Sequence, residues 1–276
     1  GSIAPAVERA YGYNTNINAA KVQRVIDAID KDKSIKAVVL RINSGGGSAL
    51  ESELIYQKLD ILKARVPVVV SMGGAAASGG YYISCSSDYI VADEFTITGS
   101  IGVVMLIPEA EVLSRKIGIK NQHITFGKFA SSYDVISKTD PEFLASLKRN
   151  SDAVYTEFKS RVEASREMEP GHLESIAQGQ IWSAEAALEN GLIDSIGTLQ
   201  TAIAKAASLS GVVSYRRVNL PAKISWIEAF SGLSSSRISS LKSLVDFHAN
   251  PANIKNLLRD QFPTLEWLYQ TPMEVN

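Results

Sequence analysis

Apolar positions in the first third of the chain follow two different spacings, and their order predicts a compact structural unit. From Asn14 to Asp32 they recur at helical spacing, which predicts an amphipathic helix. Residues 37–42 and 66–70 are apolar runs rich in β-branched side chains, typical of buried strands, and a helix over 49–64 separates them. This order predicts a right-handed strand–helix–strand unit with a parallel sheet.

The middle of the chain continues the mixed pattern. Short apolar runs predict strands at Asp88–Ala92 and His123–Phe126, and Thr98–Ile107 is predicted to be a turn followed by a hydrophobic strand. Helical periodicity covers Glu109–Ile117, and a long helix begins after Thr139 or Asp140, where Pro141 suits the first turn. Ser183 is the expected N-cap of a shorter helix. The fold class is therefore α/β.

The last part of the chain has a different pattern. From Gly211 onward a strand-like run, an aromatic-rich cluster and a serine-rich connector near 231–243 precede an interrupted helical pattern. We therefore divide the chain into a main domain, 1–210, and a mainly helical C-terminal extension, 211–276. The extension is expected to pack on the main domain or on a neighbouring subunit.

Composition narrows the class of protein. A net charge of −1 over 276 residues gives no reason to expect nucleic acid as a partner. The single cysteine, Cys85, excludes an intrachain disulfide and a cysteine-rich metal site, and its apolar neighbours favour a small core residue over a reactive thiol. No metal or cofactor is expected. Gly1-Ser2 is typical of the remnant of a removed purification tag, so a native N-terminal segment is expected to be missing.

The stretch from Val66 to Asp88 sets a buried strand directly against a serine, Ser78, that small residues surround. Glycines and alanines bring the backbone to Ser78 with little side-chain bulk, which lets a substrate approach closely. The same stretch is uncharged from Val66 to Ser87, so a transmembrane helix is the alternative. Its glycines, proline and serines argue against a helix in the membrane.

A second glycine-rich turn, Asn43–Ser48 with the sequence NSGGGS, follows the first predicted strand. It lacks the residues of a Walker loop and the register of a dinucleotide-binding turn, which disfavours phosphate binding. The other use of such a turn is to present backbone N–H groups to a developing oxyanion. That use requires a nucleophile nearby, and Ser78 in the next strand-to-helix turn supplies one.

The base that would activate Ser78 is not identified by spacing. The three histidines, His123, His172 and His248, lie outside the glycine-rich turns, so a Ser-His-Asp triad has no positive support. A neutral lysine is the other known base, but it requires burial to lower its pKa, and lysine is abundant here. Composition alone selects none.

At this point four motifs, in this order, resemble the signal peptide peptidase A (protease IV) family: NSGGGS at 43–48, SMGGAAASGGYYIS at 71–84, TGSIGV at 98–103 and AQGQIWSAEAALENGLIDSIG at 177–197. The resemblance implies a ClpP/crotonase-like fold of repeated ββα units and a membrane-anchored serine peptidase outside the cytoplasm, although this chain itself is expected to be soluble. It also implies a Ser-Lys dyad that cuts released signal peptides, and a ring- or bowl-shaped homo-oligomer. Carried over, Ser78 is the nucleophile and the N–H groups of Gly46 and Gly79 form the oxyanion hole.

Two positions depart from the family pattern. Gly45 stands where the family usually has proline, which loosens the turn. More seriously, matching GKFASSYD to the family segment that carries the general-base lysine places Ala130 at the lysine and Ser131 after it. Together with Gly1-Ser2 this indicates an engineered, inactivating Lys→Ala replacement, although a native alanine stays open. Lys128, two residues earlier, is the alternative base, and a solvent-facing lysine is its simpler interpretation.

Three classes of function remain. The first is a serine endopeptidase acting on signal peptides and other extended hydrophobic peptides, with Gly45, Gly47, Ser100 and Ser131 as substrate-binding residues. The second is a crotonase-type acyl-CoA enzyme, which the absence of an evident acidic base beside the glycine turns disfavours. The third is a non-catalytic assembly module, which the alanine at position 130 permits.

Overall fold

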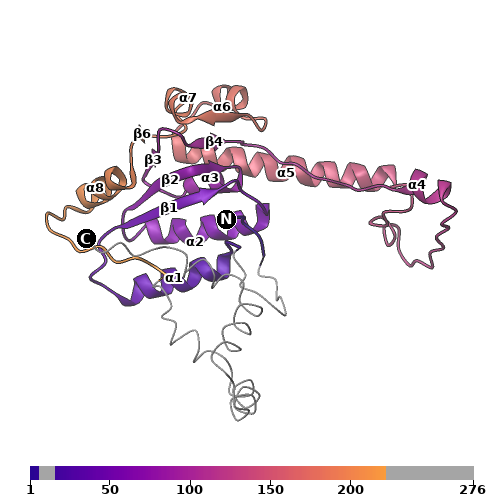
Figure 1. The fold of residues 1–276 in the computed structure, drawn as a ribbon, viewed down its shortest axis with the longest axis horizontal. Coiled ribbons are helices and arrows are strands. Elements are labelled where there is room, and N and C mark those ends of the chain that lie inside the picture. The colour runs from indigo at the N-terminus through magenta and orange to yellow at the C-terminus, as the bar shows by residue number, and fades with distance from the viewer. Residues whose placement is uncertain (6–15, 222–276) are drawn as a thin grey trace, which may run out of the picture. The chain divides into compact units, whose positions relative to one another are not determined.

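The computed structural model describes residues 1–5 and 16–221. The C-terminal extension beyond residue 221, including His248, lies outside the described residues, so the division at residue 210 stays a prediction. The elements in chain order are α1 Ala19–Lys31, β1 Val38–Ser44, α2 Ala49–Lys63, β2 Val68–Ala77, α3 Gly79–Ser84, β3 Tyr89–Ala92, β4 Ile97–Gly99, α4 Glu111–Lys116, α5 Pro141–Arg166, α6 Pro170–Ile176, β5 Ile181–Ser183, α7 Ala184–Glu189, β6 Ser195–Ile196 and α8 Leu199–Ser210 (Figure 1).

The strands form one sheet with β2 at its centre. The order is β5-β4-β2-β3-β6, and β1 pairs with the other edge of β2. All pairs are parallel except β4 with β5, so the predicted parallel strand–helix–strand unit of β1, α2 and β2 is confirmed. The first half of β2 pairs with β3 and its last three residues pair with β4. The central strand therefore ends beside the end of β4, and Ser78 follows at this point.

The apolar run of β2 is buried on both of its faces. Val68, Val70 and Met72 belong to the main core, to which α1, α2, α3 and α5 contribute, whereas Val69 packs with Ala202 of α8. Figure 1 shows α8 away from α1 and α2. Two covered faces explain why this strand has a continuous rather than an alternating apolar pattern.

Helix starts follow the predicted caps. The side chain of Asn18 accepts from the Lys21 N–H at the start of α1, and the Ser183 side chain accepts from the Ala186 N–H at the start of α7. Asp140 accepts from two N–H groups in the first turn of α5, with Pro141 directly after it.

No helix within residues 1–5 and 16–221 is both long and apolar enough to cross a membrane. The stretch considered as a transmembrane helix in the sequence is β2 followed by α3.

Residues 104–140, here called the arm, differ from the prediction. The hydrophobic strand expected after the turn in Thr98–Ile107 is not formed, since β4 takes up the start of the predicted turn and ends at Gly99, and the run His123–Phe126 is not a strand either. Residues 100–107 and 123–126 do not pair with any strand of the described chain, and Val104 and Phe126 are more than nine-tenths exposed. Figure 1 shows the arm running beside α5 to α4, at the end of α5 away from the sheet.

Candidate active site

The candidate nucleophile Ser78 follows the last residue of β2. Its backbone has a φ of 52° and a ψ of −122°, a positive φ that residues with side chains rarely adopt. The Ser78 N–H donates to the carbonyl of Gly99 in β4 at 2.9 Å, and its carbonyl accepts from the Tyr82 N–H at 2.8 Å. The main chain thus holds Ser78 at a sharp strand-to-helix turn, and its half-buried side chain does not cap α3.

The glycine-rich turn after β1 meets Ser78 at Gly46. A Cβ atom on Gly46 would lie 2.8 Å from the Ser78 Cβ and 2.7 Å from the Gly79 nitrogen, and the φ of Gly46 is +97°. Only glycine fits a position that is both this close and in this conformation. The structure therefore brings together the three residues that the sequence proposes for the nucleophile and the oxyanion hole.

The two candidate oxyanion donors, the N–H groups of Gly79 and Gly46, differ in their hydrogen bonding. The N–H of Gly79 is at the first position of α3, where no preceding turn offers it a helical acceptor. The N–H of Gly46 donates to the hydroxyl of Ser44 at 3.1 Å. A carbonyl oxygen at this place would take the acceptor position that the Ser44 hydroxyl now fills.

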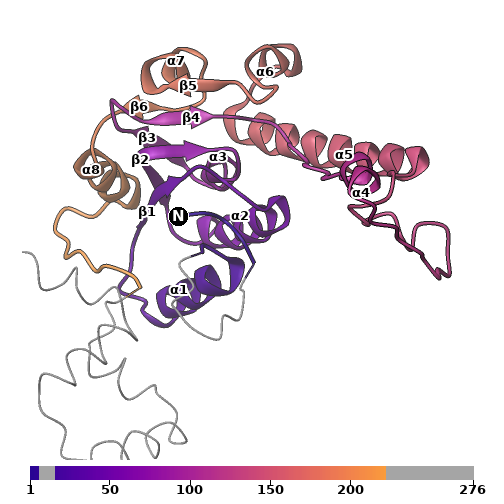
Figure 2. The ribbon, with the colours of Figure 1, turned by 45° about the vertical axis from the view of Figure 1, so that its right-hand side comes forward.

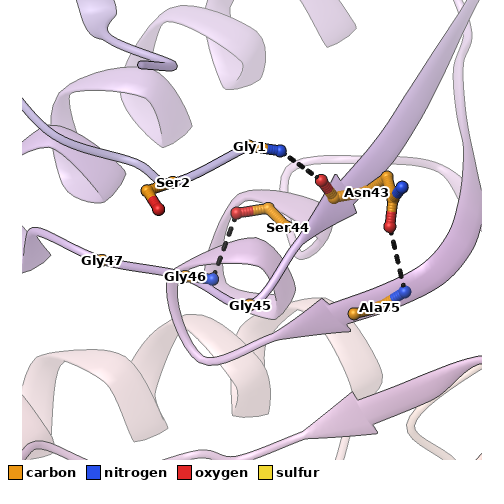
Figure 3. Close-up of a pocket in the computed structure, with 8 residues that line it drawn as sticks. All are labelled: Gly1, Ser2, Asn43, Ser44, Gly45, Gly46, Gly47 and Ala75. Carbon is orange, nitrogen blue, oxygen red and sulfur yellow. Dashed lines mark hydrogen bonds between the residues drawn. The ribbon is translucent and has the colours of Figure 1, made fainter. Parts of the chain in front are cut away.

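A cavity of about 560 Å³ opens beside the glycine-rich turn (Figure 3). Gly45, Gly46 and Gly47 line it together with Gly1, Ser2, Asn43, Ser44 and Ala75. Gly45 borders open space, whereas a Cβ on Gly47 would lie 1.9 Å from the carbonyl oxygen of Ile3. Gly47 is therefore fixed by backbone contact with the N-terminal segment, and Gly45 is the more accessible of the two predicted substrate-binding glycines.

Ser100 lies next to the nucleophile through the main chain. It follows Gly99, which accepts the Ser78 N–H, and it has a positive φ of 50°. Its own N–H donates to the carbonyl of Gln180 at 2.6 Å. Trp182 of β5 lies against Gly99, because a Cβ on Gly99 would be only 2.6 Å from the indole ring. Ser100 is thus both a turn residue and a neighbour of the site.

The family of the chain is decided by its sequence match. The model of peptidase family S49 matches residues 60–213, which is more than half of the chain and includes Ser78 and Ser100. The chain belongs to peptidase family S49. A Clp protease model matches residues 8–91, and the parallel sheet with helices on both faces agrees with the predicted ClpP-like α/β fold.

Curated relatives of this S49 chain have peptidase names. Protease 4 of Haemophilus influenzae is 35% identical over 89% of this chain and 41% of its own length. The chloroplastic serine protease SPPA of Arabidopsis thaliana is 34% identical over 83% and 35%. A putative signal peptide peptidase SppA of Enterococcus faecium is 30% identical over 81% and 69%. The chain thus spans less than half the length of the first two relatives.

One solved structure that is similar to this chain is a ClpP1 mutant from Listeria monocytogenes. It has a TM-score of 0.44 and 14% identity, over 68% of this chain and 90% of that one.

In this S49 chain the position predicted for the catalytic lysine, Ala130, lies in the arm. Phe143, at one end of α5, packs on two aromatic rings of the arm, whereas Phe158 packs on Tyr82 of α3 with 4.8 Å between ring centroids. The two phenylalanines are about 22 Å apart along the helix axis. Figure 2 shows the arm at the far end of α5. Ala130 and Ser78 are therefore not brought together within one chain.

Ser131 and Lys128, the other predicted site residues near Ala130, also lie in the arm. Ser131 is in the same turn of the arm, and Lys128 is exposed and paired with Glu142 at 2.5 Å. Among the lysines of residues 1–5 and 16–221, none is hydrogen-bonded to the Ser78 hydroxyl. The structure thus places neither Ser131 nor Lys128 at the glycine-rich turns.

The two histidines in the described part of the chain, His123 and His172, make their contacts with residues other than Ser78. His123 is in the arm, where its Nε2 is 3.0 Å from an Asp134 oxygen and 3.1 Å from the Ser137 hydroxyl. These three residue types belong to catalytic triads, but here both partners meet one ring nitrogen and the serine is not Ser78. His172 lies 3.2 Å from the Asn190 carbonyl oxygen.

Two residues near the site have structural roles. Cys85 is buried, and this burial raises the pKa of its thiol to about 12, which makes it unreactive. Trp182, expected to be a packing residue, donates from its ring nitrogen to the Ile176 carbonyl at 2.9 Å. The sequence did not indicate its contact with Gly99, since β4 and β5 are more than 80 residues apart. Within the described part of the chain, no group of three or more metal-ligating side chains occurs.

Proposed function

We propose that this chain is a serine endopeptidase that hydrolyses released signal peptides and other extended hydrophobic peptides, with Ser78 as nucleophile. The observation that supports it most is the close contact of Gly46 with Ser78 and Gly79, because it brings the glycine-rich turn against the serine turn, as an oxyanion hole built from both turns requires. Membership of family S49 and the peptidase names of the relatives point the same way.

The proposed reaction begins at the Ser78 hydroxyl. Its oxygen attacks the carbonyl carbon of the peptide bond while its proton passes to a base. The oxyanion that forms accepts hydrogen bonds from the N–H groups of Gly79 and Gly46, with the latter leaving the Ser44 hydroxyl. The leaving amine takes the proton from the base, and water then hydrolyses the acyl-serine ester.

The walls of the cavity fit an extended peptide. Gly45–Gly47 present only backbone atoms to the cavity, so a peptide main chain can approach this wall closely. Ser100, on the β4 side of the Ser78 backbone, borders the other flank of the nucleophile. We propose Gly45, Gly47 and Ser100 as substrate contacts on this basis.

The base in the proposed dyad is a lysine at position 130, which is alanine in this chain. Because Phe129, next to Ala130, packs on Phe143, about 22 Å along α5 from the Phe158 contact with α3, a lysine at position 130 would act on Ser78 of a neighbouring subunit. Exposed apolar side chains of the arm, such as Leu106 and Ile124, would be covered in such an assembly. We therefore propose a homo-oligomer in which each arm, including Ser131, completes the site of its neighbour.

The experiment compares this chain with its Ala130→Lys variant, using a serine-directed fluorophosphonate and a fluorogenic apolar peptide. We expect the variant to be labelled and to hydrolyse the peptide, and Ser78→Ala in the variant to abolish both. Absence of labelling in both proteins would overturn the peptidase proposal and favour a non-catalytic module.

Mixing two inactive proteins tests where the base comes from. The double variant Ser78→Ala/Ala130→Lys has the lysine without the serine, and the unmodified chain has the serine without the lysine. Activity in the mixture is expected if the arm acts on a neighbour. An active Ala130→Lys variant combined with an inactive mixture under exchanging conditions would show that the base acts within one chain.

A further inference from the structure

The central strand β2 has a bulge three residues before the nucleophile. Up to Met72 it pairs with β1 residue by residue, but the next pair joins Ser44 to Ala76, so residues 73–75 lie opposite Asn43 alone. Extra residues of this kind bend a strand and redirect the residues after the bend, and they are frequent beside active sites. The position of Ser78 therefore depends on how this bulge is held.

Side chains satisfy the main-chain groups that the bulge removes from the ladder. Three such bonds are present: Arg41 donates to the Met72 carbonyl at 2.9 Å, Thr96 donates to the Gly73 carbonyl at 2.6 Å, and Asn43 Oδ1 accepts from the Ala75 N–H at 3.2 Å. Figure 3 shows the bond between Asn43 and Ala75 at the edge of the cavity. Of these three bonds, only that of Asn43 joins the bulge to the strand end that leads directly into the glycine-rich turn.

The bond between Asn43 and Ala75 links the strand before the glycine-rich turn to the strand before Ser78. Asn43 is three residues before Gly46, and Ala75 is three residues before Ser78, so the bond ties the strands at equal chain distances from the contact between those residues. We propose that Asn43 is a positioning residue, which sets the register of the glycine-rich turn against the nucleophile. Its effect on catalysis rests on the peptidase function proposed above, whereas its effect on the geometry of the turn does not.

Packing gives a second connection between Asn43 and the bulge. A Cβ on Gly73 would lie 3.1 Å from Asn43 Cβ, 3.2 Å from its Cγ and 3.2 Å from the Ile42 carbonyl oxygen, closer than such atoms normally pack. A Cβ on Gly74 would meet only Asn43 Oδ1, at 3.9 Å. Alanine at position 73 should therefore push the Asn43 side chain aside, and alanine at position 74 should not.

The catalytic test uses the Ala130→Lys protein and the rate of fluorophosphonate labelling at Ser78. Asn43→Ala removes the acceptor, and we expect the labelling rate to fall by about tenfold or more, because small misplacements of reacting groups have effects of this order. Asn43→Asp keeps an acceptor of the same shape and should retain most of the rate. Equal losses in both variants, in step with a lower thermal midpoint, would overturn the positioning role.

Alanine substitutions at Gly73 and Gly74 form a matched pair of variants that both retain Asn43. Gly73→Ala should lower the labelling rate although Asn43 is still present, and Gly74→Ala should leave it unchanged. If Asn43→Ala fails to fold, this pair still tests the proposal. Equal rates for the two glycine variants would contradict it.

Amide hydrogen exchange separates this inference from the proposed function. In Asn43→Ala, peptides covering residues 43–48 and 73–79 should exchange faster than in the unmodified chain, and Asn43→Asp should restore protection. This result does not require a reactive serine. Faster exchange confined to the bulge, with residues 43–48 and 78–79 unchanged, would show that Asn43 does not set the register.

Discussion

The end of β2 and the arm are built in opposite ways. At the end of β2, Ser78 and the adjoining Gly46 are fixed by main-chain contacts, and the strand that leads to Ser78 is buried on both faces. In the arm, Val104, Leu106 and Phe126 have exposed fractions of 96%, 89% and 93%. One region is complete within the chain, whereas the other presents apolar surface that a partner would cover.

The candidate site is therefore divided between these two regions. Ser78, the proposed nucleophile, and Gly46 and Gly79, the proposed oxyanion donors, need no other subunit to reach their positions, because backbone contacts between β1, β2 and β4 define them. The proposed base is in the region whose surroundings are incomplete. Changes in the first region should therefore affect the chemistry and the stability together, and changes in the arm should affect assembly more than folding.

The largest effect is expected from Gly46→Ala. Its Cβ would press against the Ser78 Cβ and the Gly79 nitrogen, and loss of oxyanion stabilisation alone lowers rates by about a hundredfold or more. Labelling of Ser78 in the Ala130→Lys protein measures this. Gly45→Ala, at a residue with open space around it, is the control for thermal stability and should keep the midpoint. An unchanged labelling rate in Gly46→Ala would show that the contact is not part of the site.

The second largest effect is expected on the free energy of unfolding, and it should differ between substitutions at the two ends of α5. Phe158 is 3% exposed in the main core, so Phe158→Ala should lower the free energy of unfolding by about 3 to 5 kcal/mol. Phe143 packs on Phe129 and Tyr133 of the arm, so Phe143→Ala should loosen the arm with a much smaller change in the unfolding of the sheet and its helices. Urea unfolding measures both variants.

Cys85 supplies the control for this comparison. Its thiol is buried with a pKa raised to about 12, so it should react with thiol reagents only when the main core opens. Phe158→Ala should therefore speed its labelling, and Phe143→Ala should not. Faster labelling in both variants would mean that the arm and the core unfold as one cooperative unit.

The smallest effect is a pH dependence confined to the arm. Hydrogen bonds from Ser137, then Asn121 and the Ile136 N–H, lower the pKa of Asp134 from its ordinary 3.8 to about 2. Because the pKa is lower in the folded state, the carboxylate stabilises the arm above about pH 4, and this contribution is lost as the pH falls toward 2.

Pepsin cleavage followed between these two pH values tests the role of Asp134. The unmodified arm should be cleaved faster as the pH falls, and in Asp134→Asn this change should be smaller. An equal pH dependence in the two proteins would assign the effect to other groups.

The sequence predicted the buried strand and the serine turn after it, because the information there is local, but it ended the strand at residue 70, whereas β2 continues to Ala77. A β-branched run, small residues and a serine within one stretch specify a buried strand and a tight turn, and the family motifs add the partner turn. Asp140 likewise specified the start of α5 through a cap that lies beside its acceptors.

The arm and the bulge were not predictable in the same way. The apolar runs at 98–107 and 123–126 have the composition of strands, but a strand needs a neighbour, which local sequence does not specify. The bond between Asn43 and Ala75 depends on the register of two strands 32 residues apart in the sequence. The remoteness of Ala130 depends on the length and direction of α5, which periodicity alone does not place in space.

The positive φ of Ser78 also limits which amino acids can serve as nucleophile at this turn. Residues branched at Cβ are outliers in that conformation, so threonine, the other aliphatic hydroxyl nucleophile of peptidases, would distort the turn that aims it. Cysteine has an unbranched Cβ and would fit. Evolutionary exchange of the proposed nucleophile at this turn is thus confined to side chains that are unbranched at Cβ.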